Sequence, residues 1–332
     1  MKKLNIFFVV DVEGWAYAYN AQEQAKYSTH HITYKPLLEI TMDDLKGIDI
    51  LYIHGPDIWK PISDELIAKT RVMYPNIKII GVYSCENELM YPDVDLIICI
   101  SSNFYSRCCE MYKDYNIPII FMPKGIDDEV FIPGEINSSF IVGWIGRNAE
   151  VKRTHLLDKL KFSIKRHSNH FGFFNHNRSR TPTIDFLHSI SCLVLTSSSE
   201  ALPRTVLEAM SSGLPVISTR VGSLPLLLED KWLVPVNPED VVVNEINNRL
   251  SLLSTSPEVC KEVGERNRNF IEKNWSWKKL MPYWDLIFTS LYRNHNVSIK
   301  IYDKKKRSNW NILTTWIGYV ILKIMEVSHE IC

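Results

Sequence analysis

The sequence predicts an α/β protein built from two doubly wound parallel sheets. Short runs rich in Ile and Val alternate with longer helical stretches along most of the 332 residues. These runs are continuously apolar, which is typical of parallel strands that helices cover on both faces. They fall into two sets separated by a segment that contains several prolines and glycines, so we expect two domains.

Each set of apolar runs defines one expected sheet. The first set predicts strands at residues 5–10, 48–53, 77–82, 96–100 and 119–122. The second set predicts strands at residues 140–145, 192–196, 216–219 and 232–234. Because the separating segment begins at Pro123, we expect an N-terminal domain at residues 1–122 and a C-terminal domain at residues 123–276.

The helix after Glu200 has the clearest boundary signals. Pro203 suits the first helical position and Gly213 suits the position just after the last turn. Between them, Val206, Leu207 and Met210 give the helix an apolar face. Further helices are expected at residues 238–253, 257–274 and 275–292.

The C-terminal residues 277–332 form a separate helical extension. It contains a basic cluster from Lys300 to Arg307 and then an apolar stretch at residues 310–325, slightly short for a bilayer span of about 20 residues. Two interpretations stay open: residues 300–326 lie on an anionic membrane surface, or the extension crosses back to the N-terminal domain. We expect a cytoplasmic protein, peripheral on the cytoplasmic face of a membrane in the first case.

Composition excludes several functions. Lys plus Arg and Asp plus Glu number 38 each, so no overall charge attracts nucleic acid and we expect no nucleic-acid partner. The seven cysteines include no CxxC pair, which favours a reducing compartment. No cluster has metal-ligand spacing, and Asp93-Val94-Asp95 precedes a strand and is interpreted as a turn. We therefore expect no metal and no cofactor.

The most informative block runs from Ser197 to Met210 and contains Glu200 and Glu208. Glu200 closes a strand-to-loop segment, and Glu208 lies on a helix that begins at the carboxyl edge of the sheet, where α/β sheets bind ligands. The positive end of that helix favours a diphosphate. At about 1.5 Å per residue, Glu208 lies roughly 7 to 8 Å along the axis from Pro203. That offset suits a ribose diol, while Glu200 reaches a sugar.

This block resembles the signature of the retaining glycosyltransferases of family 4, also described as glycosyl transferases group 1, in which seven residues separate two glutamates. The Gly-Leu-Pro-Val-Ile stretch from Gly213 agrees with it. Pro123-Lys124-Gly125-Ile126-Asp127 resembles the interdomain Pro-Asn-Gly-Val-Asp segment of that family, with Lys124 in place of the usual Asn. Gly146-Arg147, followed by Lys152, resembles its phosphate clamp.

The resemblance implies the GT-B fold, in which two Rossmann-like doubly wound domains face each other across a cleft. It also implies a hexosyltransferase-like enzyme that moves a sugar, with retention and without a metal, from a nucleoside diphosphate sugar to an unidentified acceptor such as a glycan or a lipid-linked glycan. Arg147 and Lys152 would grip the donor diphosphate, Glu200 the transferred sugar, and Glu208 the ribose hydroxyls. Backbone donors would add to this donor site at Ala201, Leu202 and Arg204.

The N-terminal half supplies further candidates. Gly14 occupies the place where family members have a glycine-containing loop that faces donor and acceptor, although the usual paired glycines are missing. His54 ends a strand and resembles the catalytic strand-end His of the family; a packed or capping His is the alternative. The candidates for acceptor binding are Asp11, Glu13 and Trp15.

Departures from the family keep alternatives open. Fewer residues than usual separate Arg147 from Glu200, and the remnants that would recognise the base are residues 170–174 and 178–186, so the sequence does not choose the donor base. A non-catalytic sugar-nucleotide-binding subunit of a glycosylation complex is the main alternative. An epimerase of GT-B shape is the second alternative, but it would need acid and base residues that the sequence does not reveal.

Overall fold

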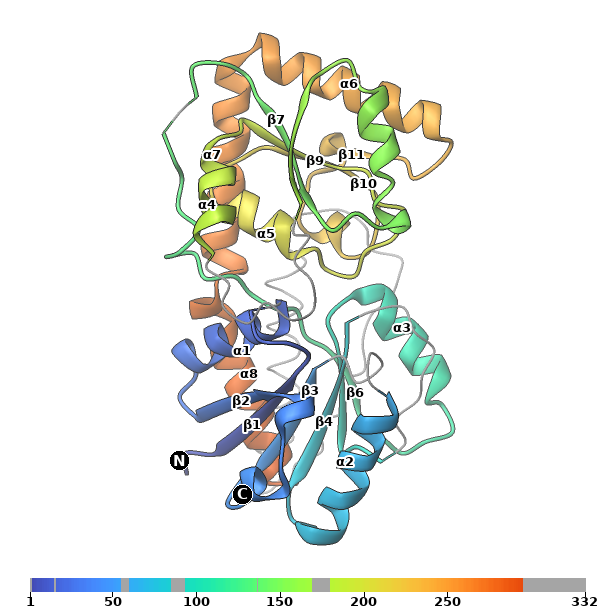
Figure 1. Ribbon diagram of the computed structural model, residues 1–332, viewed down its shortest axis with the longest axis vertical. Coiled ribbons are helices and arrows are strands. Elements are labelled where there is room, and N and C mark those ends of the chain that lie inside the picture. The colour runs from blue at the N-terminus through green and yellow to red at the C-terminus, as the bar shows by residue number, and fades with distance from the viewer. Residues whose placement is uncertain are drawn as a thin grey trace, which may run out of the picture. The chain divides into compact units, whose positions relative to one another are not determined.

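The structure is a computed structural model of the chain, and it describes residues 2–14, 16–54, 60–84, 93–135, 137–168 and 180–294. The chain divides into two compact units. Unit 1 combines Met1–Lys124 with the segment that starts at Trp277, and unit 2 is Gly125–Ser276. Figure 1 shows helices packed around a sheet in each unit.

Unit 1 contains a six-stranded parallel sheet with the order β2-β1-β3-β4-β5-β6. The strands are β1 (Asn5–Val10), β2 (His31–Pro36), β3 (Ile50–His54), β4 (Lys78–Tyr83), β5 (Leu96–Cys99) and β6 (Ile119–Phe121). The interior strands are buried almost throughout, as their continuous apolar runs predict. The sequence did not predict β2, because this edge strand is only half buried and has no such run.

The helices of unit 1 are α1 (Ala16–Tyr27), α2 (Lys60–Met73), α3 (Ser102–Met111) and α8 (Trp277–Tyr292). The last of these returns from the far end of the chain and lies beside α1 in Figure 1. Trp277 Nε1 donates to Glu23 Oε2 over 2.7 Å, and Asp285 accepts from Ser28 Oγ over 2.6 Å. These bonds and the buried side chains of α8 make it part of the core of unit 1.

Unit 2 contains a five-stranded parallel sheet with the order β11-β10-β9-β7-β8. Its strands are β7 (Val142–Gly146), β8 (Ile164–Ser168), β9 (Cys192–Leu195), β10 (Val216–Thr219) and β11 (Leu233–Val234). Its helices are α4 (Thr181–His188), α5 (Arg204–Ser211), α6 (Glu239–Thr255) and α7 (Pro257–Asn274). Short 3-10 turns complete it, including η3 (Glu150–Lys152) and η4 (Thr154–Lys159). The edge strand β8 was also missed, because its charged residues interrupt any apolar run.

Both sheets have the same topology. In unit 1 the chain passes from β1 to the edge strand β2 and then returns to the other side of β1 at β3. In unit 2 it passes from β7 to β8 and returns at β9. Strand order therefore reverses between β1 and β3, and again between β7 and β9. Ligands of parallel α/β sheets bind beyond the carboxyl ends of the strands at such reversal points.

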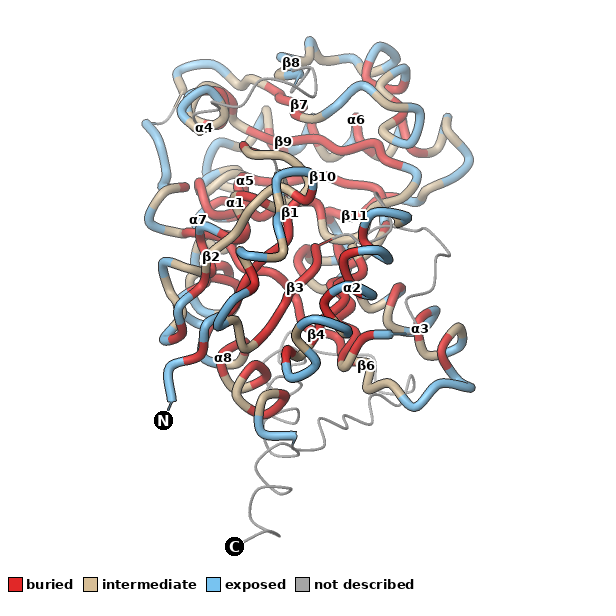
Figure 2. The backbone as a smooth tube through the Cα atoms, turned by 60° about the horizontal axis from the view of Figure 1, so that its bottom comes forward, coloured by how far each residue is buried: buried red, intermediate tan, exposed pale blue. Residues whose placement is uncertain are grey.

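Burial follows the sheets, and Figure 2 shows the strands as mostly buried segments between more exposed helices and loops. In unit 2, apolar side chains of β7, β10 and α6 form one core, among them Trp144, Ile217 and Ile246. Within the described part of the chain, no helix has both the length and the apolar character needed to cross a bilayer. Residues 295–332, which include the proposed membrane contact at 300–326, lie outside the described residues.

Candidate functional site

Four predicted side chains lie around the reversal point of the unit 2 sheet. Arg147 directly follows β7, and Lys152 is the last residue of η3. Glu200 lies in the loop after β9, and Glu208 lies on α5. Because β7 and β9 are neighbouring parallel strands, their carboxyl ends meet at one edge of the sheet. Arg147 and Glu200 therefore lie at the edge of unit 2 where a ligand is expected. Lys152 is paired with Glu200 there, and Glu208 lies on the helix that follows.

Lys152 and Glu200 form an ion pair at this edge. Lys152 Nζ lies 2.5 Å from Glu200 Oε1, and the side chains are 27% and 10% exposed. Ser197 Oγ donates to the same carboxylate oxygen over 2.7 Å. The backbone N–H of Ser198 donates to the Val151 carbonyl over 2.8 Å, which joins the loop after β9 to the turn that carries Lys152. Both charged side chains are thus held by short local bonds.

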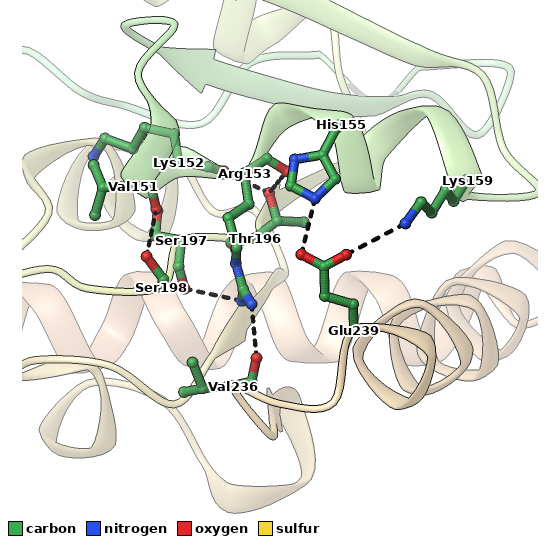
Figure 3. A network of polar contacts seen from close by, with 10 residues as sticks. All are labelled: Val151, Lys152, Arg153, His155, Lys159, Thr196, Ser197, Ser198, Val236 and Glu239. Carbon is green, nitrogen blue, oxygen red and sulfur yellow. Dashed lines mark hydrogen bonds and ion pairs between the residues drawn. The ribbon is translucent and has the colours of Figure 1, made fainter.

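Arg153, the residue after Lys152, holds the neighbouring backbone, as Figure 3 shows. It is buried, and it adopts the left-handed conformation at φ 45°. Its guanidinium donates to the carbonyls of Thr196 over 2.7 Å, Val236 over 2.8 Å and Ser197 over 3.4 Å. Burial lowers the pKa of this guanidinium. Sequence reasoning missed Arg153, because its partners are backbone carbonyls that leave no signal in residue spacing.

Glu208 is paired with Arg204, one turn earlier on α5. Arg204 Nε lies 2.8 Å from Glu208 Oε1, and the side chains are 15% and 10% exposed. Pro203 is the N-cap rather than the first helical residue that the sequence predicted. Among the described residues, no side chain caps this helix end by a hydrogen bond, and its first turn contains no acidic residue. The first turn of α5 therefore adds no negative charge at its positive end.

Gly222 supports the loop that carries Glu200. It has a φ of +53°, and a Cβ added there would lie 2.1 Å from the Glu200 carbonyl oxygen and 2.4 Å from that of Ala201. The neighbouring Ser223 N–H donates to the Ala201 carbonyl over 2.8 Å. Only glycine allows this close approach. Sequence reasoning missed Gly222, because the atoms that it contacts are backbone carbonyl oxygens.

The remaining donor candidates lie on the same edge. Arg147 is exposed, whereas Ala201 and Leu202 are half-buried in the loop between β9 and α5. Of the two segments considered for base recognition, residues 170–174 lie outside the described residues. In the second, residues 180–186 are described, and α4 begins there at Thr181.

The corresponding edge of unit 1 gathers Asp11, His54 and Lys124. Asp11 follows β1, His54 ends β3, and Lys124 comes three residues after β6. Lys124 Nζ lies 3.3 Å from His54 Nδ1, and both residues are buried. Burial raises the pKa of Asp11 to about 6, while the backbone N–H groups of Val12 and Asp11 and the charge of Lys124 act in the opposite direction. Burial first, and then the charge of Lys124, lower the pKa of His54 well below its ordinary value.

Tyr17, from α1, completes this group and was not predicted. Its ring stacks on the His54 ring with centroids 5.0 Å apart and planes 19° apart. Lys124 Nζ lies 4.7 Å from the centroid of the same ring, an attractive cation–π position. The Tyr17 hydroxyl is hydrogen-bonded to Ser84 Oγ, at the end of β4. Residues at the ends of β1, β3, β4 and β6, together with Tyr17 of α1, thus contribute to one polar and aromatic cluster.

The other predicted residues of unit 1 are engaged elsewhere or lie outside the description. Glu13 Oε1 accepts from Tyr34 Oη over 3.1 Å and from Gln22 Nε2 over 3.3 Å, which ties it to β2 and α1. Gly14 makes the turn between β1 and α1 with a φ of 75°. Trp15 lies outside the described residues.

The Asp93-Val94-Asp95 segment joins a different network. Arg71 Nε lies 3.0 Å from Asp93 Oδ1, and Arg71 Nη1 lies 3.0 Å from Asp95 Oδ2. The Ile79 N–H also donates to Asp95 Oδ2 over 2.7 Å. These bonds hold the residues that lead into β5 against α2 and β4.

Comparison with known proteins finds glycosyltransferases among the proteins similar to this chain. Residues 138–270, within unit 2, match the model of the family Glycosyl transferases group 1. An uncharacterized glycosyltransferase of Methanocaldococcus jannaschii is 26% identical over 253 residues, which cover 69% of this chain and 65% of that protein. A phosphatidylinositol N-acetylglucosaminyltransferase subunit from Arabidopsis thaliana is 28% identical over 320 residues, covering 79% and 67%. The chain thus spans about two thirds of the length of these relatives.

Structural similarity covers both units. Anabaena HepE, solved in complex with UDP-glucose, matches with a TM-score of 0.63 and 12% identity over 88% of this chain and 100% of that chain. At 12% identity, the similarity to HepE shows a shared fold and nothing more. Together with the two parallel-sheet units, it confirms the GT-B fold, and the family match confirms the resemblance to group 1. This chain has the GT-B fold, and its residues 138–270 match the model of the glycosyl transferases group 1 family.

Proposed function

We propose that the chain is a glycosyltransferase that moves a sugar from a nucleoside diphosphate sugar to an acceptor, with retention at the anomeric carbon. The observation that carries the proposal is the Lys152–Glu200 ion pair at the reversal point of the unit 2 sheet. The names of the two relatives, both of them glycosyltransferases, support this reaction class. The UDP-glucose complex of HepE supports a nucleotide sugar as donor.

The donor diphosphate would lie between the cations of unit 2 and the start of α5. A diphosphate is anionic, and Arg147, Lys152 and the positive helix end are three sources of positive potential on one edge of the sheet. Glu200, which already holds Lys152 at 2.5 Å, would accept a hydrogen bond from the transferred sugar. Glu208 on α5 would accept hydrogen bonds from the ribose hydroxyls.

The reaction needs stabilisation of the leaving group. The bond between the anomeric carbon and the diphosphate oxygen breaks, the acceptor oxygen bonds to the same face of that carbon, and the acceptor proton passes to the departing diphosphate. Arg147 and Lys152 would neutralise the charge that grows on the diphosphate. Since these cations and the helix end supply that charge, we expect the reaction to proceed without a divalent metal.

Asp11 and His54 would act from unit 1. A buried neutral imidazole and a buried carboxyl group can donate to and accept from hydroxyl groups. Glu13, Gly14 and Trp15 remain the other candidates on this side. We propose no acceptor, but the Arabidopsis relative, named for a phosphatidylinositol substrate, favours testing lipid-linked acceptors first.

A second candidate function is that of a sugar-nucleotide-binding subunit without turnover. The observation in its favour is that the Arabidopsis relative is named as one subunit of a transferase. Donor turnover separates the two. A transferase incubated with UDP-, GDP- or ADP-sugars releases the nucleoside diphosphate slowly with water alone, whereas a binding subunit releases none. If the protein binds one of these sugar nucleotides tightly but releases a nucleoside diphosphate from none of them, the transferase proposal is wrong and the binding-subunit proposal takes its place.

Retention is tested separately on the product. When a donor and an acceptor have been found, nuclear magnetic resonance of the glycoside product gives its anomeric configuration. The proposal requires the configuration of the donor to be kept. An inverted product would leave the transferase assignment standing and remove the same-face mechanism.

A further inference from the structure

The buried contact between Lys124 and His54 points to a role for Lys124 that the proposed function does not include. Lys124 follows the edge strand β6, and His54 ends β3, near the middle of the same sheet. The two side chains nevertheless meet, with Nζ 3.3 Å from Nδ1, and the residues are only 5% and 4% exposed. A lysine ammonium group is normally buried only where partners hold it, because otherwise the side chain extends into solvent.

The chemistry of the two groups fixes the direction of their hydrogen bond. An ammonium group carries three donors and no acceptor, so Nδ1 of His54 must be the acceptor and must carry no proton. Burial and the adjacent positive charge both disfavour a second proton on the ring. The imidazole is therefore neutral, and its single proton lies on Nε2.

Two contacts hold the ring in place for that proton. Tyr17 stacks on one face of His54 at 5.0 Å, and Tyr52 meets the ring edge-on at 4.7 Å. Tyr17 also lies under the Lys124 ammonium group at 4.7 Å. Lys124 thus contacts both the imidazole and the aromatic ring that packs on it, so its position is coupled to the orientation of His54.

Two polar atoms of the cluster have no partner among the described residues. Among the described residues, the buried His54 Nε2 has no hydrogen-bond partner, and neither does Asp11 Oδ1. Val9 pairs with Ile53 in the parallel ladder, so Asp11 lies one residue beyond the position opposite His54. A buried donor and a buried acceptor left without partners at a reversal point match the hydroxyl groups of a saccharide, since each hydroxyl both donates and accepts.

We propose that Lys124 is a positioning residue: it donates to Nδ1 of His54 and so presents Nε2–H to a hydroxyl group of a saccharide bound at this edge of unit 1. The contact with a saccharide hydroxyl rests on the proposed function, whereas the assignment of the His54 tautomer does not. Lys124 stands where the resembled family has Asn. An amide can donate or accept, and only the lysine imposes one direction on the bond.

The tautomer is tested by nuclear magnetic resonance on the ¹⁵N-labelled full chain, with His54→Asn used to assign the ring signals. The wild type should show a bare, hydrogen-bonded Nδ1 and a protonated Nε2. Lys124→Arg, which also can only donate, should keep this pattern, and Lys124→Met should shift the Nδ1 signal. Lys113→Met, at an exposed lysine of unit 1, should change nothing. A proton on Nδ1 in the wild type, or an Nδ1 signal unchanged in Lys124→Met, would overturn the proposal.

The function of Lys124 through His54 is tested by a double-mutant cycle. Lys124→Met should lower transfer by about tenfold or more, by analogy with the loss seen when a partner that orients a metal-bound histidine is removed. The same change in the His54→Asn background should have little further effect, because Lys124 acts through that ring. Independent, additive losses would overturn the positioning role. Unfolding curves of all variants establish that each is folded before its rates are compared.

The source of the saccharide hydroxyl is separated by two assays. If it belongs to the donor sugar, Lys124→Met slows hydrolysis of the donor by water as well as transfer. If it belongs to the acceptor, the variant slows only transfer. The two proposals can fail separately. If all the proteins are folded and His54 shows the expected tautomer, but even the wild type transfers no sugar, the proposed function is contradicted. The contact between Lys124 and His54 is then still supported.

Discussion

Lys152 Nζ and Glu200 Oε1 lie 2.5 Å apart, so the residue predicted to bind a diphosphate and the residue predicted to bind the sugar form one ion pair. Exposed ion pairs contribute little to stability, typically about 0 to 1 kcal/mol. This pair is more restrained, because Ser197 also donates to the carboxylate and Arg153 holds the backbone beside it. Its main effect is to keep a cation and an anion in place before a ligand arrives.

The ion pair predicts opposite effects on the binding of a nucleoside diphosphate. Lys152→Ala removes an attractive charge and should weaken binding of the diphosphate by about tenfold, whereas Glu200→Gln removes a repulsive charge and should leave it equal or tighter. Both variants should lose turnover. Calorimetric titration measures the affinities, and the exposed pair Lys261–Glu265 of α7 supplies the controls Lys261→Ala and Glu265→Gln. The same direction of change in both site variants would contradict the account.

Gly222→Ala should disturb the donor site through the backbone. The added Cβ would lie 2.1 Å from the Glu200 carbonyl oxygen, so the loop must move in addition to the strain of a positive φ. We expect the free energy of unfolding to fall by about 2 kcal/mol or more, together with weaker donor binding. Gly47→Ala is the matched control, because Gly47 has a φ of +74° and nothing within 4 Å of its added Cβ. Equal losses in the two variants would show that the contact with Glu200 is unimportant.

Arg153→Met should lower the free energy of unfolding by about 2 to 3 kcal/mol. Methionine fills most of the volume but leaves the buried carbonyls of Thr196 and Val236 without their donor. Donor affinity should fall as well, because these carbonyls belong to the backbone that carries Lys152 and Glu200. Denaturant unfolding gives the stability change, with Arg220→Met, at an exposed pair with Asp230, as the comparison. A loss no larger than that of Arg220→Met would refute the anchoring role.

Asp11→Asn should stabilise the protein more as the pH rises. The pKa of Asp11 is raised to about 6 from 3.8, so the folded state holds a proton that the unfolded state has already released. The stability that this gives is fully present below about pH 4 and is lost as the pH rises through 6. Asparagine cannot ionise, so the Asp11→Asn variant does not lose this stability. Its free energy of unfolding, relative to that of the wild type, should therefore rise by about 1 to 3 kcal/mol between pH 4 and pH 7.5. A difference independent of pH would argue against a buried, protonated Asp11.

Much of the fold could be predicted because interior strands have a simple signature. β3 and β4 are buried almost throughout, and their sequences are continuous apolar runs. The edge strands β2 and β8 escaped prediction because both are only partly buried and neither needs such a run. The edge strand β11 is buried and was predicted. The return of α8 to unit 1 depends on contacts such as Trp277 with Glu23, which join residues 254 positions apart.

Some residues of the candidate site could likewise be predicted from the sequence, and others could not. Glu200, Glu208 and Lys152 were readable because their spacing and order form a motif on a short stretch of chain. Arg153 and Gly222 were not, because they act on backbone carbonyls, and any residue type has one of those. Lys124 was noticed only as a departure from a family pattern. Its contact with His54 depends on the fold of the whole unit 1 sheet.

The donor site is tested by calorimetric titration of UDP, GDP and ADP into the wild type, Arg147→Ala and Glu208→Ala. We expect one of these diphosphates to bind the wild type at 1:1 and each variant to bind it more weakly, while exposed Lys159→Ala in unit 2 binds it as the wild type does. Binding of a nucleoside diphosphate that neither substitution weakens would contradict a donor site at this edge of unit 2.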